Sequence, residues 1–220
     1  GTLLFWVVRG VGAGESFGGL FAEVIGTAGV SLTAAFVAAL IGIPIAVLSV
    51  RFPSRTSSGL ERLTFIGFAL PGVSVALAFV FFATAIARPI YQTTFLLVIA
   101  YVVLFLPAAV GAIQVSLRQV SPRIEEAARG LGKTSYQAFL LVTLPLLSRG
   151  VAAGAALVFL LSMKELPATL ILAPIGFETL ATSVWSAASE AFYARAALPA
   201  LLLVITASVP MALIVIRERR

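Results

Sequence analysis

Residues 127–134 read AARGLGKT and come close to a motif that binds phosphate groups. A phosphate-binding loop has the pattern G-x-x-x-x-G-K-S/T, and Ala127 stands here in place of the first glycine. Such a loop follows a buried strand and works with an aspartate that holds the magnesium ion. This stretch follows the sequence VSPRIEE, and the chain contains no aspartate. The spacing therefore does not predict that this chain binds a nucleotide.

The missing residue types exclude most enzyme chemistry. All nine acidic residues are glutamate, and the chain has no aspartate, histidine or cysteine. A histidine-based triad, a thiol nucleophile, a cysteine–histidine zinc site and a disulfide framework are therefore excluded. We expect no catalytic residue and no bound cofactor in this chain, and the pattern leaves open whether it binds a metal.

The overall composition is that of a membrane protein. Of the 220 residues, 60% are hydrophobic and 11% are charged, with a mean hydropathy of +1.10, against about 25% charged residues in soluble domains. The net charge of +6 comes from lysines and arginines in short clusters between long apolar runs. That arrangement indicates contacts with lipid phosphates and does not indicate a nucleic-acid partner.

Lys164 and Glu165 are adjacent charges that follow an apolar run and precede Pro167. A charge at the bilayer centre costs about 2.5–3.5 kcal/mol, so charges there are usually paired or functional. Helix neighbours point in different directions, and we expect no ion pair between these two. One interpretation places Lys164, Glu165 and Pro167 at a translocation path or gate. The other places both charges near the outer interface, where they reach water.

Long uncharged runs must position these residues. Four runs have 21 to 29 residues, enough to cross a hydrocarbon core of about 30 Å as helices: residues 24–50, 63–87, 89–117 and 196–216. A fifth run, residues 150–163, reaches full length only if Lys164 and Glu165 lie near one end of the span. With residues 2–8 as the remnant of a further helix, we expect an all-α, polytopic bundle of five spans forming one domain over residues 1–220.

The distribution of positive charge predicts the orientation. Alternating spans place eleven lysines and arginines on one side and three on the other, the three being Arg9, Arg88 and Arg195. Because positive charge is enriched on the cytoplasmic side, the C-terminus and the loop over residues 118–149 are expected in the cytoplasm.

Two patterns predict close helix packing and broken helices. Small residues recur at four-residue spacing, in the sets Ser31, Ala35, Ala39; Ala34, Ala38, Gly42; and Gly150, Gly154. Five prolines follow leucine, at positions 71, 107, 145, 167 and 199. A proline removes a helical hydrogen bond, so it either breaks a span where protein or water satisfies the freed carbonyl or ends a helix at the interface.

The loop over residues 118–149 is predicted to form two short helices. Ser121 and Pro122 begin the first one, and Gly130 and Gly132 supply residues that can end it. Thr134 with Gln137 forms a capping-box pattern that begins the second. A projecting pair of helices is a docking element.

The same loop resembles the EAA loop of the inner-membrane permeases of binding-protein-dependent ABC importers, which reads E-A-A-x3-G-x9-I-x-L-P. The matching residues are Glu126, Ala127, Ala128, Gly132, Val142, Leu144 and Pro145. Only the isoleucine differs, and Val142 is nearly isosteric with it. The resemblance extends over most of the chain and implies the fold of a type I importer permease in a bacterial inner membrane.

The resemblance also implies partners. The loop would be the coupling helix that docks on a cytoplasmic ATP-binding subunit, where ATP is bound and hydrolysed. A second permease half would complete the translocation path, and a periplasmic substrate-binding protein would deliver the substrate.

The region from Met163 to Trp185 is similar to the iron(III) branch of these permeases, whose chains often hold two permease halves. This sequence is most similar to the second half, and we expect it to be a fragment of such a longer chain. Thiamine, putrescine, phosphonate and sulfate permeases share parts of the pattern, so they remain alternatives. An ion-coupled secondary carrier is a further alternative, but four of the five expected spans lack the acidic residues or histidines that such carriers place at mid-membrane.

Overall fold

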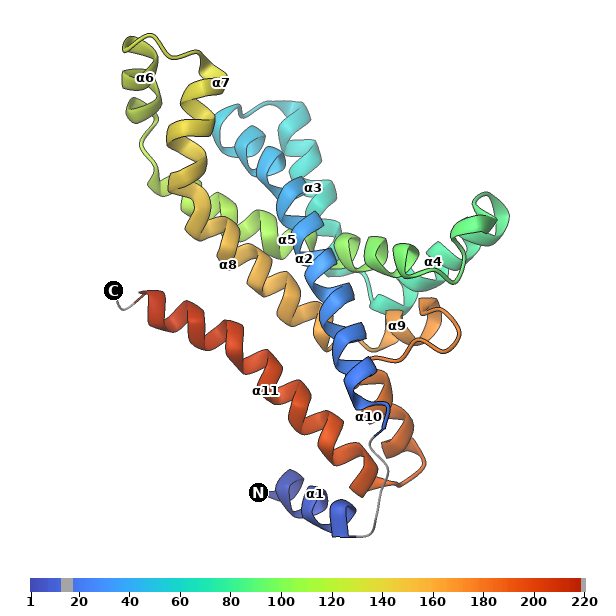
Figure 1. The fold of residues 1–220 in the computed structure, drawn as a ribbon. Helices are drawn as coiled ribbons and strands as arrows, with labels where there is room; N and C mark the ends of the chain where they lie inside the picture. Colours follow the sequence, from blue (N-terminus) through green and yellow to red (C-terminus); the bar gives the residue numbers. More distant parts are fainter. Residues whose placement is uncertain (13–17, 219–220) are drawn as a thin grey trace.

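The computed structural model describes residues 1–12 and 18–218, with side chains placed as far as Ser208. Throughout this part of the chain the regular elements are helices (Figure 1). In order they are α1 Thr2–Gly12, α2 Leu20–Arg51, α3 Arg55–Ala69, α4 Gly72–Ala85, the 3-10 turn Arg88–Ile90, α5 Thr94–Gln119, α6 Pro122–Gly130, α7 Ser135–Ala138, the π-helix Phe139–Thr143, α8 Leu144–Met163, α9 Pro167–Leu172, α10 Leu180–Ser189 and α11 Tyr193–Glu218. The all-α fold class is confirmed.

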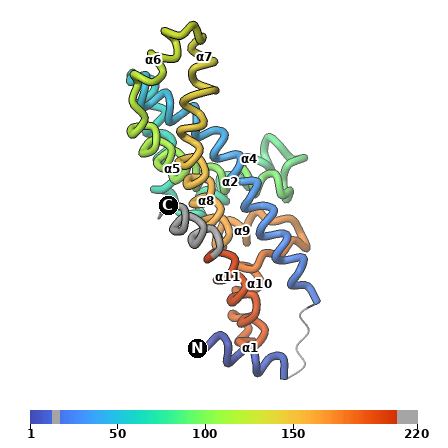
Figure 2. Tube along the Cα trace, turned by 60° about the vertical axis from the view of Figure 1, so that its left-hand side comes forward, coloured from blue at the N-terminus to red at the C-terminus, as the bar shows by residue number. Residues whose placement is uncertain are grey.

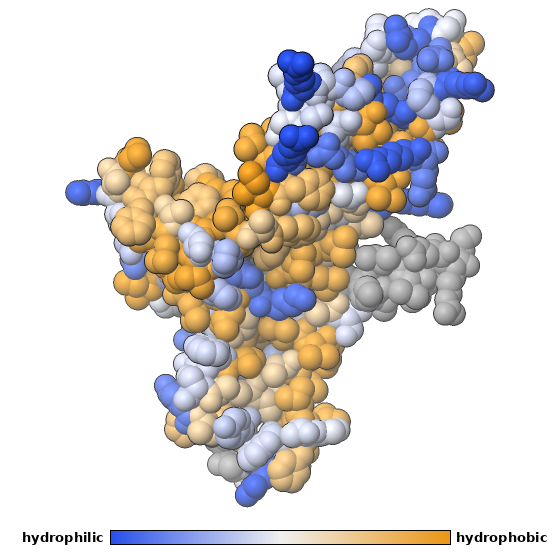
Figure 3. Space-filling model, turned by 180° about the vertical axis from the view of Figure 1, so that it is seen from behind, coloured by the Kyte–Doolittle hydropathy of each residue, from blue (hydrophilic) through white to orange (hydrophobic). Residues whose placement is uncertain are grey.

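Three helical stretches in the described part are long and apolar enough to cross a membrane: α2, α5, and the continuous stretch Ser135–Met163. The predicted run 24–50 lies inside α2. The run 89–117 becomes helical only at Thr94, because Arg88–Ile90 forms a 3-10 turn first. Apolar side chains cover the middle of the molecule, and polar ones gather at the end that carries α6 and α7 (Figure 3).

The run 63–87 is not one straight span, which corrects the expectation from its length. Helices α3 and α4 meet at an angle of 109°. Leu70 is extended at the break, with φ −92° and ψ 131°, and Pro71 caps α4. The proline ring disfavours the helical conformation at the preceding residue and removes a backbone donor. The bent pair is either one broken span or a re-entrant loop, so the described part holds three spans, or four if the pair crosses as one.

The short run 150–163 becomes long enough to span a membrane because its helix extends towards the N-terminus, and it does not continue past Lys164 and Glu165. The helix extends backwards through the π-helix and α7, so that residues Ser135–Met163 form one stretch of 29 residues. It ends at Met163, and Lys164 is its C-terminal cap. The condition set by the sequence is therefore met, because both charges lie just beyond one end of this stretch.

Helices α2, α5 and α8 pack against one another and form the core, as their small residues predicted. Ala34 and Ala38 are completely buried on α2. A methyl group added at Gly150 of α8 would collide with Ser116 of α5, and one added at Gly154 would lie only 3.0 Å from the backbone of Ala109. The absence of side chains at these two glycines lets the helices approach closely.

The leucine–proline pairs do not all break helices. Pro107 lies inside α5. Pro199 lies within α11, which holds the predicted run 196–216 as one continuous helix. Pro167 lies in the first turn of α9, where a missing N–H is harmless, and Pro145 lies directly after the π-helix, inside the continuous stretch Ser135–Met163. Pro71 separates two helices that are bent by 109°.

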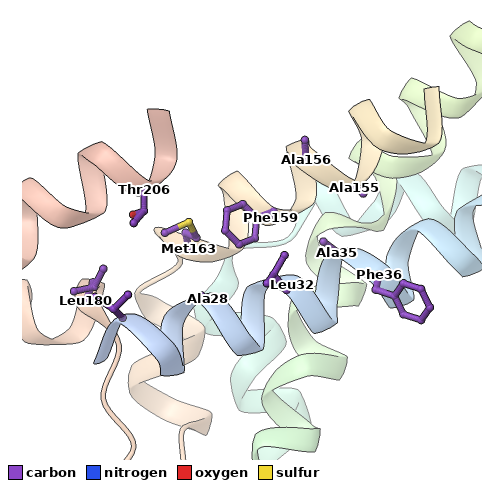
Figure 4. A pocket seen from close by; sticks show the side chains of 11 residues that line it. Ala28, Leu32, Ala35, Phe36, Ala155, Ala156, Phe159, Met163, Leu180 and Thr206 are labelled. Carbon is purple, nitrogen blue, oxygen red and sulfur yellow. The ribbon is translucent and has the colours of Figure 1, made fainter. Parts of the chain in front are cut away.

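Helix α11 packs mainly on α1 and α10, with fewer contacts to α8. Figure 2 shows α1, α10 and the first part of α11 at the end of the molecule opposite α6 and α7. An apolar cavity of about 580 Å³ lies between α11 and the core (Figure 4). Phe159 and Met163 from α8, Leu32 from α2 and Thr206 from α11 are among the side chains that line it. Its lining is almost entirely apolar.

Candidate functional site: a projecting loop and a charged turn

The first loop helix, α6, is closed at both ends by local backbone contacts. The Ser121 hydroxyl accepts a hydrogen bond from the Arg123 N–H at 3.4 Å, and Pro122 occupies the first turn. At the other end, the N–H groups of Gly132 and Lys133 donate to the carbonyls of Arg129 and Ala128. This is a Schellman motif, and Gly132 adopts its required positive φ of 86°. Gly130 is the last helical residue, so Gly132 alone makes the corner.

The second loop helix begins at a full capping box. The Thr134 hydroxyl accepts from the Gln137 N–H at 3.2 Å, and the Gln137 side chain accepts from the Thr134 N–H at 3.1 Å. The helix then passes through a π-turn over Phe139–Thr143 into α8. The predicted pair of short helices is therefore present, and the second one joins a long helix without a break.

The seven motif residues are all in this loop, at the polar end of the molecule (Figures 1 and 3). Glu126 and Ala127 are exposed, and Ala128 is half-buried. Gly132 is exposed at the corner between the two helices. Val142, Leu144 and Pro145 lie where the π-turn passes into α8, with Val142 and Leu144 half-buried. The loop thus presents a short helix with one free carboxylate and two small side chains.

Sequence reasoning missed the contacts that hold the base of this loop. Arg51, the last residue of α2, donates from Nη2 to the Val120 carbonyl at 2.7 Å. The same nitrogen lies 3.7 Å from Oε1 of Glu125. That oxygen also accepts a hydrogen bond from the Thr143 hydroxyl at 2.7 Å. Among side chains that the structure describes, Arg51 and Glu125 form the sole ion pair within 4 Å.

A second polar group links the core to the bent pair. The Gln114 amide donates to the Ser49 hydroxyl at 2.7 Å and to Oε1 of Glu61 at 2.8 Å. Gln114 is on α5, Ser49 on α2 and Glu61 on α3, so three helices meet here. The Gln114 side chain is buried, and these two acceptors satisfy both hydrogens of its amide group.

The charged turn lies at the far end of the stretch Ser135–Met163. Lys164 is exposed and Glu165 is half-buried. Oε1 of Glu165 accepts a hydrogen bond from the Ala168 N–H at 3.0 Å, which caps the start of α9. Pro167 is exposed at the first position of α9. The structure thus brings these three residues together, and it keeps them apart from the projecting loop by about 40 Å of helix.

Glu165 also contacts the other broken helix. A methyl group added at Gly72, the first residue of α4, would lie 2.6 Å from Oε1 of Glu165. Thr169 donates to the Glu165 carbonyl and shares a further hydrogen bond with the hydroxyl of Tyr101 on α5. The break before α4 and the turn before α9 therefore meet at one carboxylate. No group of three acidic, histidine or cysteine side chains in the described part is placed to hold a metal ion.

The chain is similar to known transport proteins. The family described as "Binding-protein-dependent transport system inner membrane component" matches residues 17–220. The chain is 37% identical over 216 residues to the "Fe(3+)-transport system permease protein FbpB 2" of Haemophilus influenzae, covering 96% of this chain and 42% of that protein. It is 33% identical to the "Putrescine transport system permease protein PotI" of Escherichia coli, covering 72% of this chain and 59% of that protein. The chain thus spans about half the length of these two relatives.

Solved structures share the fold. An "amino acid ABC transporter with histidines" has a TM-score of 0.67 at 18% identity, covering 91% of this chain and 92% of that one. The MetNI methionine ABC transporter in inward-facing conformations has a TM-score of 0.68 at 18% identity, covering 99% and 97%. At this level of identity the likeness shows the fold alone. Together with the family match, it shows that the chain belongs to the inner-membrane components of binding-protein-dependent transport systems, the permeases of ABC importers.

Proposed function

We propose that this chain forms half of a translocation path and couples it to a cytoplasmic ATP-binding subunit through residues 118–149. The exposed carboxylate of Glu126, on the short helix that ends at the Schellman motif of Gly132, carries this proposal. Ala127 and Ala128 leave room for close helix contact on the same element. ATP would be bound by the partner subunit, because this chain has no complete nucleotide-binding motif.

The orientation and the remaining partners form part of the same proposal. The loop and the C-terminus would face the cytoplasm of a bacterium, in line with the eleven positive residues assigned to that side. A second permease half and a periplasmic binding protein would complete the importer. The chain would be the second half of a longer two-half permease, consistent with its coverage of 42% of the Haemophilus relative.

Iron(III) is the proposed substrate. The 37% identity to an Fe(3+)-transport permease over almost the whole chain supports it. Putrescine remains the alternative because PotI is 33% identical. Sulfate remains another because the "Sulfate transport system permease protein CysT" of Escherichia coli is 32% identical over 74% of this chain and 64% of that protein.

Lys164, Glu165 and Pro167 are the proposed gate. Glu165 supports this assignment best, since its carboxylate lies where the α3–α4 break meets the start of α9. Uptake of radioactive iron(III) by cells that produce a Glu165→Gln chain at normal levels tests the assignment. Reduced uptake is expected, and wild-type uptake would remove Glu165 from the path.

Association with the ATP-binding subunit tests the coupling role. Co-purification of that subunit with the wild-type chain is expected, and Glu126→Arg is expected to weaken it because the substitution reverses the exposed charge. Arg123→Gln is the matched control, because Arg123 is exposed on the same helix outside the motif. Equal recovery of the subunit with all three chains would contradict the proposed docking. Competition of iron(III) uptake by putrescine and by sulfate distinguishes the substrates.

A further inference from the structure

The base of the projecting loop is tied to the core by three side chains outside the motif. Arg51 ends α2, and its guanidinium reaches both the Val120 carbonyl at 2.7 Å and the Glu125 carboxylate at 3.7 Å. The Glu125 carboxylate in turn accepts from Thr143 at 2.7 Å. We name Arg51, Glu125 and Thr143 the brace. Its members come from α2, α6 and the π-turn before α8.

Burial separates the brace from the docking face of the loop. The side chains of Arg51 and Glu125 are 13% and 29% exposed, and Thr143 is 1% exposed. Glu126 follows Glu125 directly on α6, yet it is exposed. Successive residues of a helix point about 100° apart, so α6 directs one carboxylate outwards and the other towards the core. The inward carboxylate is therefore available for a role within this chain.

Thr143 lies at the junction between the π-turn and α8. It is the last residue of the π-turn and lies directly before Leu144 and Pro145 of the motif. A π-turn holds one more residue per turn than the flanking helix, and such turns occur frequently at functional sites. The brace thus ties α6 to the point where α8 departs from regular α-helical geometry.

From this placement we propose that Arg51 and Glu125 are positioning residues for energy coupling. They hold α6 on the end of α2, so that a displacement of the loop is passed to α2 and through it to the core of α2, α5 and α8. Without Arg51 and Glu125 the loop still docks, but its displacement no longer moves α2. The proposal rests on the proposed coupling function and adds the route within this chain.

The test uses the complete importer, reconstituted in proteoliposomes with its ATP-binding subunit, its other permease half and its binding protein. Three quantities are measured: the affinity for the ATP-binding subunit, the rate of ATP hydrolysis, and the substrate molecules transported per ATP. Glu125→Gln keeps the side-chain shape and an acceptor for Thr143 but removes the charge. We expect unchanged affinity, retained hydrolysis and a fall in transport per ATP of about two- to thirtyfold.

Two comparisons separate this role from simple stabilisation. Arg55→Gln is the matched control for Arg51→Gln, since Arg55 is an exposed arginine in the first turn of α3, next to the end of α2. Arg55→Gln is expected to keep the wild-type transport per ATP. If Arg51 and Glu125 act through each other, the double variant loses no more transport per ATP than the worse single variant. Losses that multiply would overturn the proposal.

The remaining outcomes are decisive as well. Wild-type transport per ATP in Glu125→Gln overturns the proposal, and so does a loss that only follows reduced affinity for the subunit. If Glu125→Gln does not assemble, Thr143→Val removes one brace contact with a side chain of equal size and is judged by the same measures. Failure of the wild-type chain to bind the ATP-binding subunit is a separate result, which refutes the proposed function itself.

Discussion

The carboxylate of Glu165 occupies the space in which a side chain at Gly72 would begin, although the two residues belong to different segments of the chain. A methyl group at position 72 would lie 2.6 Å from Oε1 of Glu165, and Pro167 is the next neighbour at 3.7 Å. The glycine at the start of α4 therefore makes room for the carboxylate that caps α9.

Gly72→Ala is expected to displace Glu165 and to reduce transport while the chain still inserts and assembles. The added methyl cannot be accommodated unless the carboxylate moves and weakens its bond to Ala168. Gly29→Ala is the matched control, because a methyl group there meets nothing within 4 Å. Transport assays on membranes with equal amounts of each chain check this. Equal transport rates for the two variants would show that the close approach of Gly72 and Glu165 is not needed for transport.

Gly132→Ala is expected to weaken the docking of the loop. Gly132 has a φ of 86°, which costs a residue with a side chain about 1 kcal/mol or more. The Schellman corner would shift, and the orientation of α6 with it. Gly130→Ala serves as the control, since position 130 is helical and open. Titration with the ATP-binding subunit should show weaker binding for Gly132→Ala alone, and the reverse order would refute the assignment of the corner.

Gly150→Ala is expected to destabilise the bundle by about 1–3 kcal/mol, the usual cost of overpacking. The added methyl would collide with Ser116 on α5. Gly111→Ala, on α5 with open space around it, should be neutral or slightly stabilising. Thermal unfolding of the purified chains in detergent measures the difference. Equal midpoints would contradict the close packing of α5 and α8.

Tyr101→Phe is expected to lower stability by about 1 kcal/mol and to reduce transport by loosening the turn that holds Glu165. The substitution removes the hydroxyl that bonds to the buried Thr169 side chain. Thr169 keeps its bond to the Glu165 carbonyl, so assembly should survive. Tyr91→Phe is the control, because Tyr91 is exposed. If both variants transport at the same rate, the Tyr101 hydroxyl does not hold the turn.

Local sequence patterns were sufficient to predict the parts of the fold that depend on neighbours along the chain. The capping box at Thr134 and the corner at Gly132 involve residues within a few positions of each other, and both are present in the fold. The long uncharged runs are also a local feature, and they predicted the long apolar helices. The two helices of the loop and the motif that they carry could therefore be predicted from the amino-acid sequence alone.

The leucine–proline dipeptide has different effects in different surroundings. Leucine–proline bends the chain by 109° at Pro71 but leaves α5 continuous at Pro107. At Pro107 the carbonyl of Val103 loses its helical partner, and the backbone of Gly67 approaches that oxygen so closely that no side chain would fit. Packing by a distant segment decides between the two outcomes. The brace was missed for the same reason, because Arg51 and Glu125 are far apart in the sequence.

The continuous stretch Ser135–Met163 carries the loop at one end and the charged turn at the other. A helical stretch of 29 residues is about 40 Å long. A tilt of about 5° at the loop end would carry the turn at Glu165 sideways by about 3–4 Å, more than the length of a hydrogen bond. A small tilt at the loop end is thereby converted by leverage into a shift large enough to exchange the contacts of a single carboxylate.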